Sequence, residues 1–184
     1  LFPYTTLFRS TAFVITLDTS AQYTPLSDHG QVVFGAQDNA QTGGCYNILT
    51  QTIYTHQAAA ADTVIQSGID LLYYYADDDK NTIASSGANI EDGVFPVNPG
   101  TWTITRETRY FKTSLAEDDF NMAVNDSIIL ANYEQGDAKR KAKNLQSGNI
   151  YTFKTESGQL GMFMVDAVDG TNEGNITISL KIQE

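Results

Sequence analysis

Three consecutive aspartates, Asp77, Asp78 and Asp79, are the residues of this chain best suited to hold a cation. Carboxylates gathered in one loop are the oxygen ligands that calcium prefers. The twelve-residue calcium loop, however, places its oxygens at alternate positions around a central glycine and ends on a distant glutamate, and that spacing is missing here. The sequence therefore favours a solvated turn that ends a hydrophobic strand, with Asp77 and Asp79 as weak metal candidates.

Nucleophilic catalysis would have to come from Cys45, the single cysteine, with His29 or His56 as its base. No nucleophile-elbow motif surrounds these residues, and Gly43-Gly44 lacks the following lysine or third glycine of a phosphate or dinucleotide loop. We expect Cys45 to be a small buried apolar side chain, His56 to start a helix, and no cofactor. A hydrolase with a Cys45/His dyad or with scattered carboxylates stays as the alternative.

Trp102 is the candidate ligand-binding residue. Flat aromatic rings stack on the faces of sugars, and an exposed ring is the usual platform for such contacts. Trp102 is the only tryptophan and follows the turn Asn98-Pro99-Gly100, which could place it at a rim. Because large aromatic side chains are mostly buried, the sequence favours core packing and keeps the ligand platform as the alternative.

The net charge of the chain restricts the classes of partner that it can bind. Eleven basic and 22 acidic residues among 184 give a net charge of −11, with an isoelectric point near 4.4. This charge repels phosphate backbones, so no nucleic acid partner is expected. No run reaches the roughly 18 apolar residues of a membrane span. With 41% hydrophobic residues, the chain can bury one substantial core, which predicts a single globular domain over residues 11–184.

The clearest strand signals lie at the C-terminal end. Residues 175–183 alternate between large aliphatic and polar side chains, which indicates a half-buried strand. Residues 160–168 are apolar on both parities, so this strand must lie in the middle of a sheet with both faces covered. Residues 148–155 supply a third strand, and Ser157-Gly158 and Asp169-Gly170 mark the reversals. The pattern predicts a three-strand antiparallel meander.

The rest of the chain adds further strands and two helices. Strand signals fall at residues 11–17, 31–36, 45–54, 69–76, 101–111 and 127–131, and polar loops or connectors at residues 28–30, 37–44, 77–79, 81–99 and 137–143. An alanine-rich apolar stripe predicts a helix over residues 56–66, and the capping-box pattern of Ser114 and Glu117 predicts another over residues 115–124. We expect a strand-rich α+β domain, with a mixed or antiparallel sheet that carries two short helices and ends in the meander.

Pairing and coverage of these elements can also be predicted. The order of extended segment, helix and buried strand over residues 45–76 makes a parallel pair possible. The second face of the middle meander strand needs a cover, either the helix near Ser114 or the sheet that contains residues 69–76. Gly161 is expected to let a neighbouring ring or backbone approach this strand closely.

Two motifs resemble uncharacterised surface lipoproteins of gut Bacteroidota. They are Ile-Asp-Leu-Leu-Tyr-Tyr-Tyr at residues 69–75 with Thr-Ile-Ala-Ser-Ser at 82–86, and Leu-Gln-Ser-Gly-Asn-Ile-Tyr-Thr-Phe-Lys-Thr at 145–155 with Gly158 and Gly161. The resemblance covers most of residues 31–184 and brings no catalytic residue. It implies an exported protein of the cell envelope or outer surface. Cys45, well inside the domain, does not fit the lipid-anchor cysteine of that family, so membrane contact is expected only through a lost lipid anchor.

The first ten residues, Leu-Phe-Pro-Tyr-Thr-Thr-Leu-Phe-Arg-Ser, resemble translated sequencing-adapter read-through from metagenomic reading frames. We expect residues 1–10 to be a non-native leader. The remaining sequence predicts a non-enzymatic, exported accessory or binding domain of the cell envelope. Its expected partner is a glycan or another surface protein.

Overall fold

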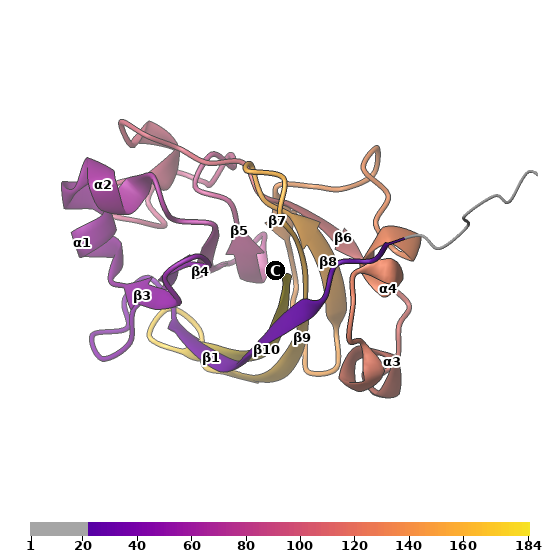
Figure 1. Ribbon diagram of the computed structural model, residues 1–184. Coiled ribbons are helices and arrows are strands. Elements are labelled where there is room, and N and C mark those ends of the chain that lie inside the picture. Colours follow the sequence, from indigo (N-terminus) through magenta and orange to yellow (C-terminus); the bar gives the residue numbers. More distant parts are fainter. Residues whose placement is uncertain (1–21) are drawn as a thin grey trace, which may run out of the picture.

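The computed structural model describes residues 22–184, which form two five-stranded antiparallel sheets (Figure 1). The first sheet has the order β1 (Leu26–Gly35), β10 (Asn175–Gln183), β9 (Leu160–Asp169), β8 (Ile150–Lys154) and β6 (Arg109–Lys112). The second has the order β3 (Thr52–Tyr54), β2 (Cys45–Asn47), β4 (Leu71–Ala76), β5 (Lys80–Ala84) and β7 (Lys141–Ala142). The predicted strand at residues 11–17 lies outside the described residues, as does the predicted leader.

The predicted strand-rich α+β class and the C-terminal meander of β8, β9 and β10 are confirmed. The structure contains more sheets and helices than the single sheet with two helices that the sequence predicts. Four short helices accompany the two sheets in the described part of the chain. They are α1 (His56–Ala61), α2 (Thr63–Gln66), α3 (Glu117–Met122) and α4 (Ser127–Ala131), with a 3-10 turn at Pro99–Thr101.

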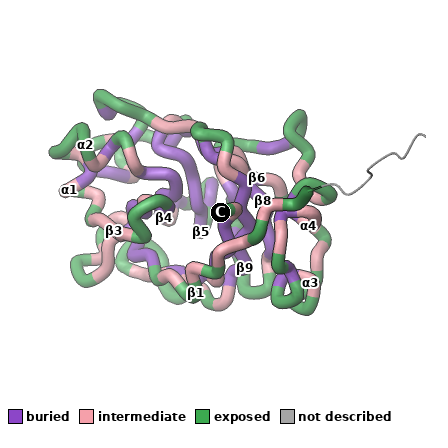
Figure 2. The backbone as a smooth tube through the Cα atoms, in the orientation of Figure 1, coloured by how far each residue is buried: buried purple, intermediate pink, exposed green. Residues whose placement is uncertain are grey.

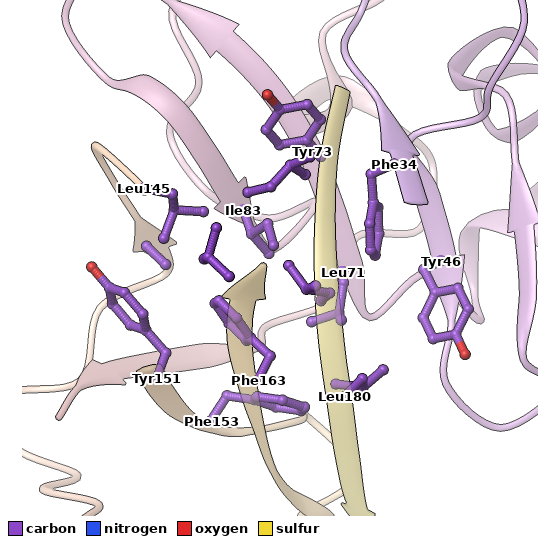
Figure 3. Packing of buried hydrophobic residues seen from close by; sticks show 14 of the residues in the cluster. Phe34, Tyr46, Leu71, Tyr73, Ile83, Leu145, Tyr151, Phe153, Phe163 and Leu180 are labelled. Atoms are coloured by element: carbon purple, nitrogen blue, oxygen red, sulfur yellow. The ribbon is translucent and has the colours of Figure 1, made fainter. Parts of the chain in front are cut away.

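The central core lies between the two sheets. Figure 3 shows Phe153 and Phe163 of the first sheet converging with Leu71 and Ile83 of the second. The Tyr151 and Phe163 rings stack with their centroids 5.4 Å apart. In Figure 2 the buried residues follow the strands in the middle, and exposed residues gather on the peripheral loops. Apolar burial of this extent is the main favourable term in the folding of such a domain.

Strand β9 is covered on both faces, as its sequence predicts. Phe163 and Val165 point into the central core, whereas Met162 and Met164 pack with Phe120 of α3 and with α4. Both proposed covers are therefore present, one on each side. The outer face of the second sheet is covered in the same way by α1, by residue Ile69 and by residues 88–102. The described part of the chain therefore has four layers.

Several local predictions were wrong because the same short sequence pattern is compatible with more than one local structure. The helix predicted over residues 56–66 breaks at Asp62, whose backbone is extended and whose carboxylate accepts a hydrogen bond from the Val64 amide at 2.7 Å. Aspartate competes in this way for helical amides. Residues 127–131 form helix α4 rather than a strand, since a short apolar run does not distinguish the two periods.

Three segments predicted as loops or connectors contribute to strands. Asp28-His29-Gly30 lies inside β1 as a bulge, where the register shifts and Gly30 takes a positive φ of 68°. Strand β5 lies in the stretch that reads as irregular, and β7 lies in the predicted connector 137–143. Polar residues on these short strands hide the apolar alternation that would reveal them.

The parallel pair that the order of elements made possible does not form among residues 22–184, although the crossover that suggested it exists. β2 pairs antiparallel with both β3 and β4, so β3 and β4 run in the same direction on either side of β2. Helix α3 also begins later than predicted, at Glu117, and Asp119 instead of Glu117 accepts the N-terminal hydrogen bond, from the Ala116 amide at 2.8 Å. Phe120 is buried there as predicted, but Val124 is exposed.

Lys181 fastens α3 to the first sheet. Its side chain is buried on the outer face of β10, and Nζ donates to the carbonyl oxygens of Phe120, Asn121 and Ala123 at 2.9, 3.1 and 2.9 Å. These three acceptors match the three protons of an ammonium group. The cation also lies 5.2 Å from the centre of the Phe120 ring. A buried charge is thereby satisfied by backbone oxygens at a helix end.

Replacing Gly161 with alanine should destabilise the protein by about 1–3 kcal/mol, the usual cost of overpacking. A Cβ atom on Gly161 would lie 2.3 Å from Cζ of Phe153 and 2.9 Å from Cδ1 of Ile182, both in the central core. Gly136→Ala is the matched control, because a Cβ there meets nothing within 4 Å. Urea unfolding measures both. Equal midpoints for the two variants would contradict the close packing of Phe153 on Gly161.

Candidate functional site

An open cleft of about 1500 Å³ lies where loops from both sheets meet. Four segments line it: residues 37–38 after β1, residues 75–78 at the end of β4, residues 91–96, and residues 169–175 of the β9–β10 turn. A volume of this size is ample for a ligand or for a segment of another chain. The cleft is the candidate binding site of the described residues.

The β9–β10 turn is fixed to the loop after β1 by backbone hydrogen bonds. The amide of Ala36 donates to the carbonyl of Gly174 at 3.0 Å, and the amide of Asp38 donates to that of Asn172 at 2.9 Å. The Asn39 side chain adds bonds to the carbonyls of Glu173 and Gly174. Main-chain hydrogen bonds therefore hold this wall of the cleft in place.

Gln37 links this wall to the second sheet. Its side-chain amide donates to the Tyr75 carbonyl at 2.8 Å and accepts from the Tyr75 amide at 3.0 Å. The side chain thus bonds Tyr75 at the end of β4 as a neighbouring strand would. The arrangement joins the two sheets beside the cleft.

The wall made by residues 91–96 is held differently. Phe95 inserts its ring into the outer core of the second sheet, 4.7 Å from the His56 ring and 5.7 Å from the Tyr74 ring, measured between centroids. Asn98 donates to the Ile90 carbonyl and to Asp92 within the same loop. Side-chain packing, above all that of Phe95, attaches this wall to the rest of the molecule.

The cleft is strongly acidic. Its lining includes seven carboxylates and no lysine, arginine or histidine: Asp38, Asp77, Asp78, Glu91, Asp92, Asp169 and Glu173. Amide and hydroxyl groups of Gln37, Asn172, Asn175 and Thr171 lie among them, together with the rings of Tyr75 and Phe95. The cleft therefore offers hydrogen-bond acceptors and a negative potential.

The three consecutive aspartates separate into two environments. Asp77 and Asp78 line the cleft, whereas Asp79 is buried and binds Lys141 Nζ at 2.7 Å, Lys143 Nζ and the Tyr74 hydroxyl. Burial alone would raise the pKa of the Asp79 carboxyl, but the hydrogen bonds from Lys141, Lys143 and Tyr74 outweigh it and hold the pKa at about 2.

Two lysines therefore stand beside Asp79 where a metal cation would have to bind. Asp77, the other weak metal candidate, faces the cleft and is not part of this ion cluster. Among residues 22–184, no group of three or more His, Cys, Asp or Glu side chains is arranged to hold a metal ion. The Asp79 cluster fastens the β4–β5 turn to β7.

Cys45 and the two histidines lie in separate settings. Cys45 is fully buried, and burial raises the pKa of its thiol far above neutral pH. His29 Nδ1 lies 3.3 Å from the Tyr46 hydroxyl, and His56 Nε2 lies 3.1 Å from the Tyr73 carbonyl oxygen. No hydrogen bond joins Cys45 to either ring within the described chain. The geometry needed to activate the thiol is missing there.

Trp102 lies in the outer core of the second sheet and is only 7% exposed. Its indole Nε1 is buried without a hydrogen-bond partner among the described residues. The ring thus offers no open face to a sugar. The rings that border the cleft are Tyr75 and Phe95.

The sequence identified Asp77 but missed the other segments of the cleft. Residues 37–44, 81–99 and the Asp169-Gly170 reversal were recognised as polar loops, and their Asp, Asn and Gly content was the available signal. The pairing of β1 with β10 and the position of β4 bring these loops together. Neither could be predicted from the sequence.

Among solved structures, the chain is similar to a DUF4466 family protein from Parabacteroides merdae, with a TM-score of 0.64 at 13% sequence identity. The match covers 86% of this chain and 54% of that chain, so this chain spans about half the length of that protein. No family model and no curated protein matches the sequence. The predicted resemblance to Bacteroidota proteins is thereby confirmed at the level of the fold.

Replacing Asp79 with asparagine should destabilise the protein by about 2 kcal/mol at neutral pH, because its carboxyl has a pKa of about 2 instead of 3.8. The folded state favours the ionised form, so this contribution is complete above about pH 4 and is lost as the pH falls through about 2. Urea unfolding of both proteins between pH 7 and pH 2 tests this.

Asp77→Asn is the matched control for this experiment, since Asp77 is exposed and outside the ion cluster. Its unfolding free energy should stay within about 0.5 kcal/mol of the wild type. A constant difference between the wild type and Asp79→Asn at every pH would contradict the ionised, ion-paired state of Asp79.

Proposed function

We propose that this protein is a non-enzymatic binding domain of the cell envelope, and that the acidic cleft holds its partner. The observation that carries the proposal is the open cleft of about 1500 Å³, whose lining includes seven carboxylates. Its main-chain-fixed wall and the Gln37 link provide a preorganised surface, which lowers the cost of binding. The partner is a glycan or a segment of another surface protein.

Binding is favoured over hydrolysis by what surrounds each reactive group. The thiol of Cys45 is enclosed and protonated, and neither histidine bonds to it. Burial raises the pKa of the Asp70 carboxyl, as a general acid would require, but Asp70 lies outside the cleft and pairs with Arg106 at 3.0 Å. These groups support structural roles.

Export to the cell envelope is the second part of the proposal. It rests on the motifs that resemble surface lipoproteins of gut Bacteroidota and on the fold shared with the Parabacteroides merdae protein. None of the helices among residues 22–184 is long and apolar enough to cross a membrane. Attachment would come from a lipid anchor outside the described residues.

The charge of the cleft restricts its partner. Sulfated or uronic-acid glycans would be repelled by seven carboxylates, whereas neutral sugars can donate their hydroxyl protons to the same groups. A protein segment that fits the cleft would carry lysine or arginine. These two partners differ in one measurable respect, because attraction between charges weakens with added salt and neutral hydrogen bonding does so far less.

A glycan array and a panel of purified envelope proteins test the proposal. We expect at least one ligand whose affinity falls tenfold or more in the double variant Asp77→Asn and Asp78→Asn, because this change removes two carboxylates from the cleft wall. Isothermal calorimetry measures the affinities. Repeating the titration at 0.05 and 0.5 M salt separates a basic protein segment, whose binding weakens, from a neutral glycan.

Asp118→Asn is the control, since Asp118 is exposed on α3 and outside the cleft. It removes one negative charge without touching the site and should keep the wild-type affinity. Ligands that bind the double variant as tightly as the wild type, or the absence of any ligand in both screens, would refute the proposal.

A further inference from the structure

His56 contacts the cleft wall at residues 91–96 through the ring of Phe95. It is the first residue of α1, it is half-buried, and three elements contact its ring. The Tyr73 carbonyl of β4 lies 3.1 Å from Nε2, and the Phe95 ring lies 4.7 Å away between centroids. Gly44, next to β2, is so close that a Cβ atom there would lie 2.3 Å from Cε1 of the histidine.

The hydrogen bond assigns the proton on this ring. A carbonyl oxygen can only accept, so Nε2 carries the proton and Nδ1 is bare in the neutral imidazole. A second proton would have to go to Nδ1. No described residue accepts a hydrogen bond from Nδ1, so the added charge would lie unpaired against the Phe95 ring and the outer core of the second sheet.

The ionisable groups on the surrounding elements do not compensate such a charge. They are the Cys45 thiol on β2, the Tyr54 phenol on β3, the Tyr73 and Tyr74 phenols on β4, and Glu91 and Asp92 beside Phe95. None of them forms an ion pair or hydrogen bond with the His56 ring within the described chain. Asp79, which bonds to Tyr74, is already paired with Lys141 and Lys143.

The wall at residues 91–96 is held by side-chain contacts and by few main-chain hydrogen bonds. The one backbone hydrogen bond formed by the amides of residues 91–97, from Val94 to the Glu91 carbonyl at 3.4 Å, stays inside the loop. Ile90 and Phe95 are its buried anchors in the outer core. The wall at residues 169–175, in contrast, is joined to residues 36–38 by main-chain bonds. A disturbance at Phe95 should therefore move residues 91–96 and leave the wall at residues 169–175 in place.

We propose that protonation of His56 releases Phe95 and opens the 91–96 wall of the cleft, so that the site is closed at neutral pH and loosened in acid. When Phe95 leaves, the imidazolium becomes fully hydrated and water satisfies Nδ1. The sheets keep their own hydrogen bonds and core. The consequence for ligand binding rests on the function proposed for the cleft, whereas the opening itself needs no ligand.

The size of the effect follows from linkage. Burial lowers the pKa of His56 from 6.5 to about 4, and the bond to the Tyr73 carbonyl opposes this only in part. An opened state in which the ring is solvated regains the ordinary value. Because the open state then binds the proton more tightly, the ratio of open to closed molecules should rise roughly 70-fold between pH 7.5 and pH 4.5.

Trp102 is a natural reporter for this opening. It is the only tryptophan, and its ring belongs to the same outer core as Phe95. We expect acrylamide quenching of its fluorescence to increase as the pH falls, with the midpoint of the His56 ring titration followed by NMR. Far-UV circular dichroism should stay constant over the same range, because the sheets remain folded.

His56→Gln should abolish the pH dependence of quenching, since glutamine can still donate to the Tyr73 carbonyl but does not titrate. His29→Gln is the matched control: the chain has two histidines, and His29 lies against Tyr46, away from Phe95. It should keep the wild-type response.

Three results would overturn the proposal. Quenching in the wild type could stay constant from pH 7.5 to 4.5, the rise could persist in His56→Gln, or the circular dichroism could be lost with the same midpoint, which would mean global unfolding. The wild-type measurements are decisive even if His56→Gln does not fold. They are made on the free protein, so a failed ligand screen leaves their outcome unaffected.

Discussion

The burial of β9 on both faces is the constraint from which the rest of the architecture follows. A strand with apolar side chains on both parities is stable only between two apolar layers. One layer is the second sheet, which supplies the central core, and the other is the pair α3 and α4. The second sheet then has an outer face of its own to cover, and α1 with residues 88–102 covers it. Four layers result from one doubly buried strand.

This layering explains which parts of the fold could be predicted from the sequence. The meander was predictable because β9 and β10 are long, each has a clear apolar pattern, and glycine turns join the strands; Gly161 was correctly interpreted as the place where a ring approaches. Short elements were not. Residues 127–131 and the β7 strand contain too few side chains to distinguish a period of 2 from one of 3.6, and their conformation is decided by what they pack on.

The candidate site was beyond sequence prediction for a different reason. Asp77 and Asp79 are two residues apart, yet one faces the cleft and the other is held by Lys141 and Lys143, which come from a distant part of the chain. Trp102 likewise shows that a residue of a type suited to ligand binding can instead be buried in the core. The cleft depends on the pairing of β1 with β10, a contact between the two ends of the described chain.

The two walls of the cleft show how a rigid fold can carry a movable part. The wall at residues 169–175 is joined to the loop after β1 through main-chain bonds and includes the ends of β9 and β10, so moving it would disturb the first sheet. The wall at residues 91–96 is attached by side chains that insert into an outer core, and that core is separated from the central one by the whole second sheet. Loss of its packing therefore leaves the main stabilising layer intact. Local opening of this kind belongs to the weakly held end of a protein's range of stability, from which binding loops are generally drawn.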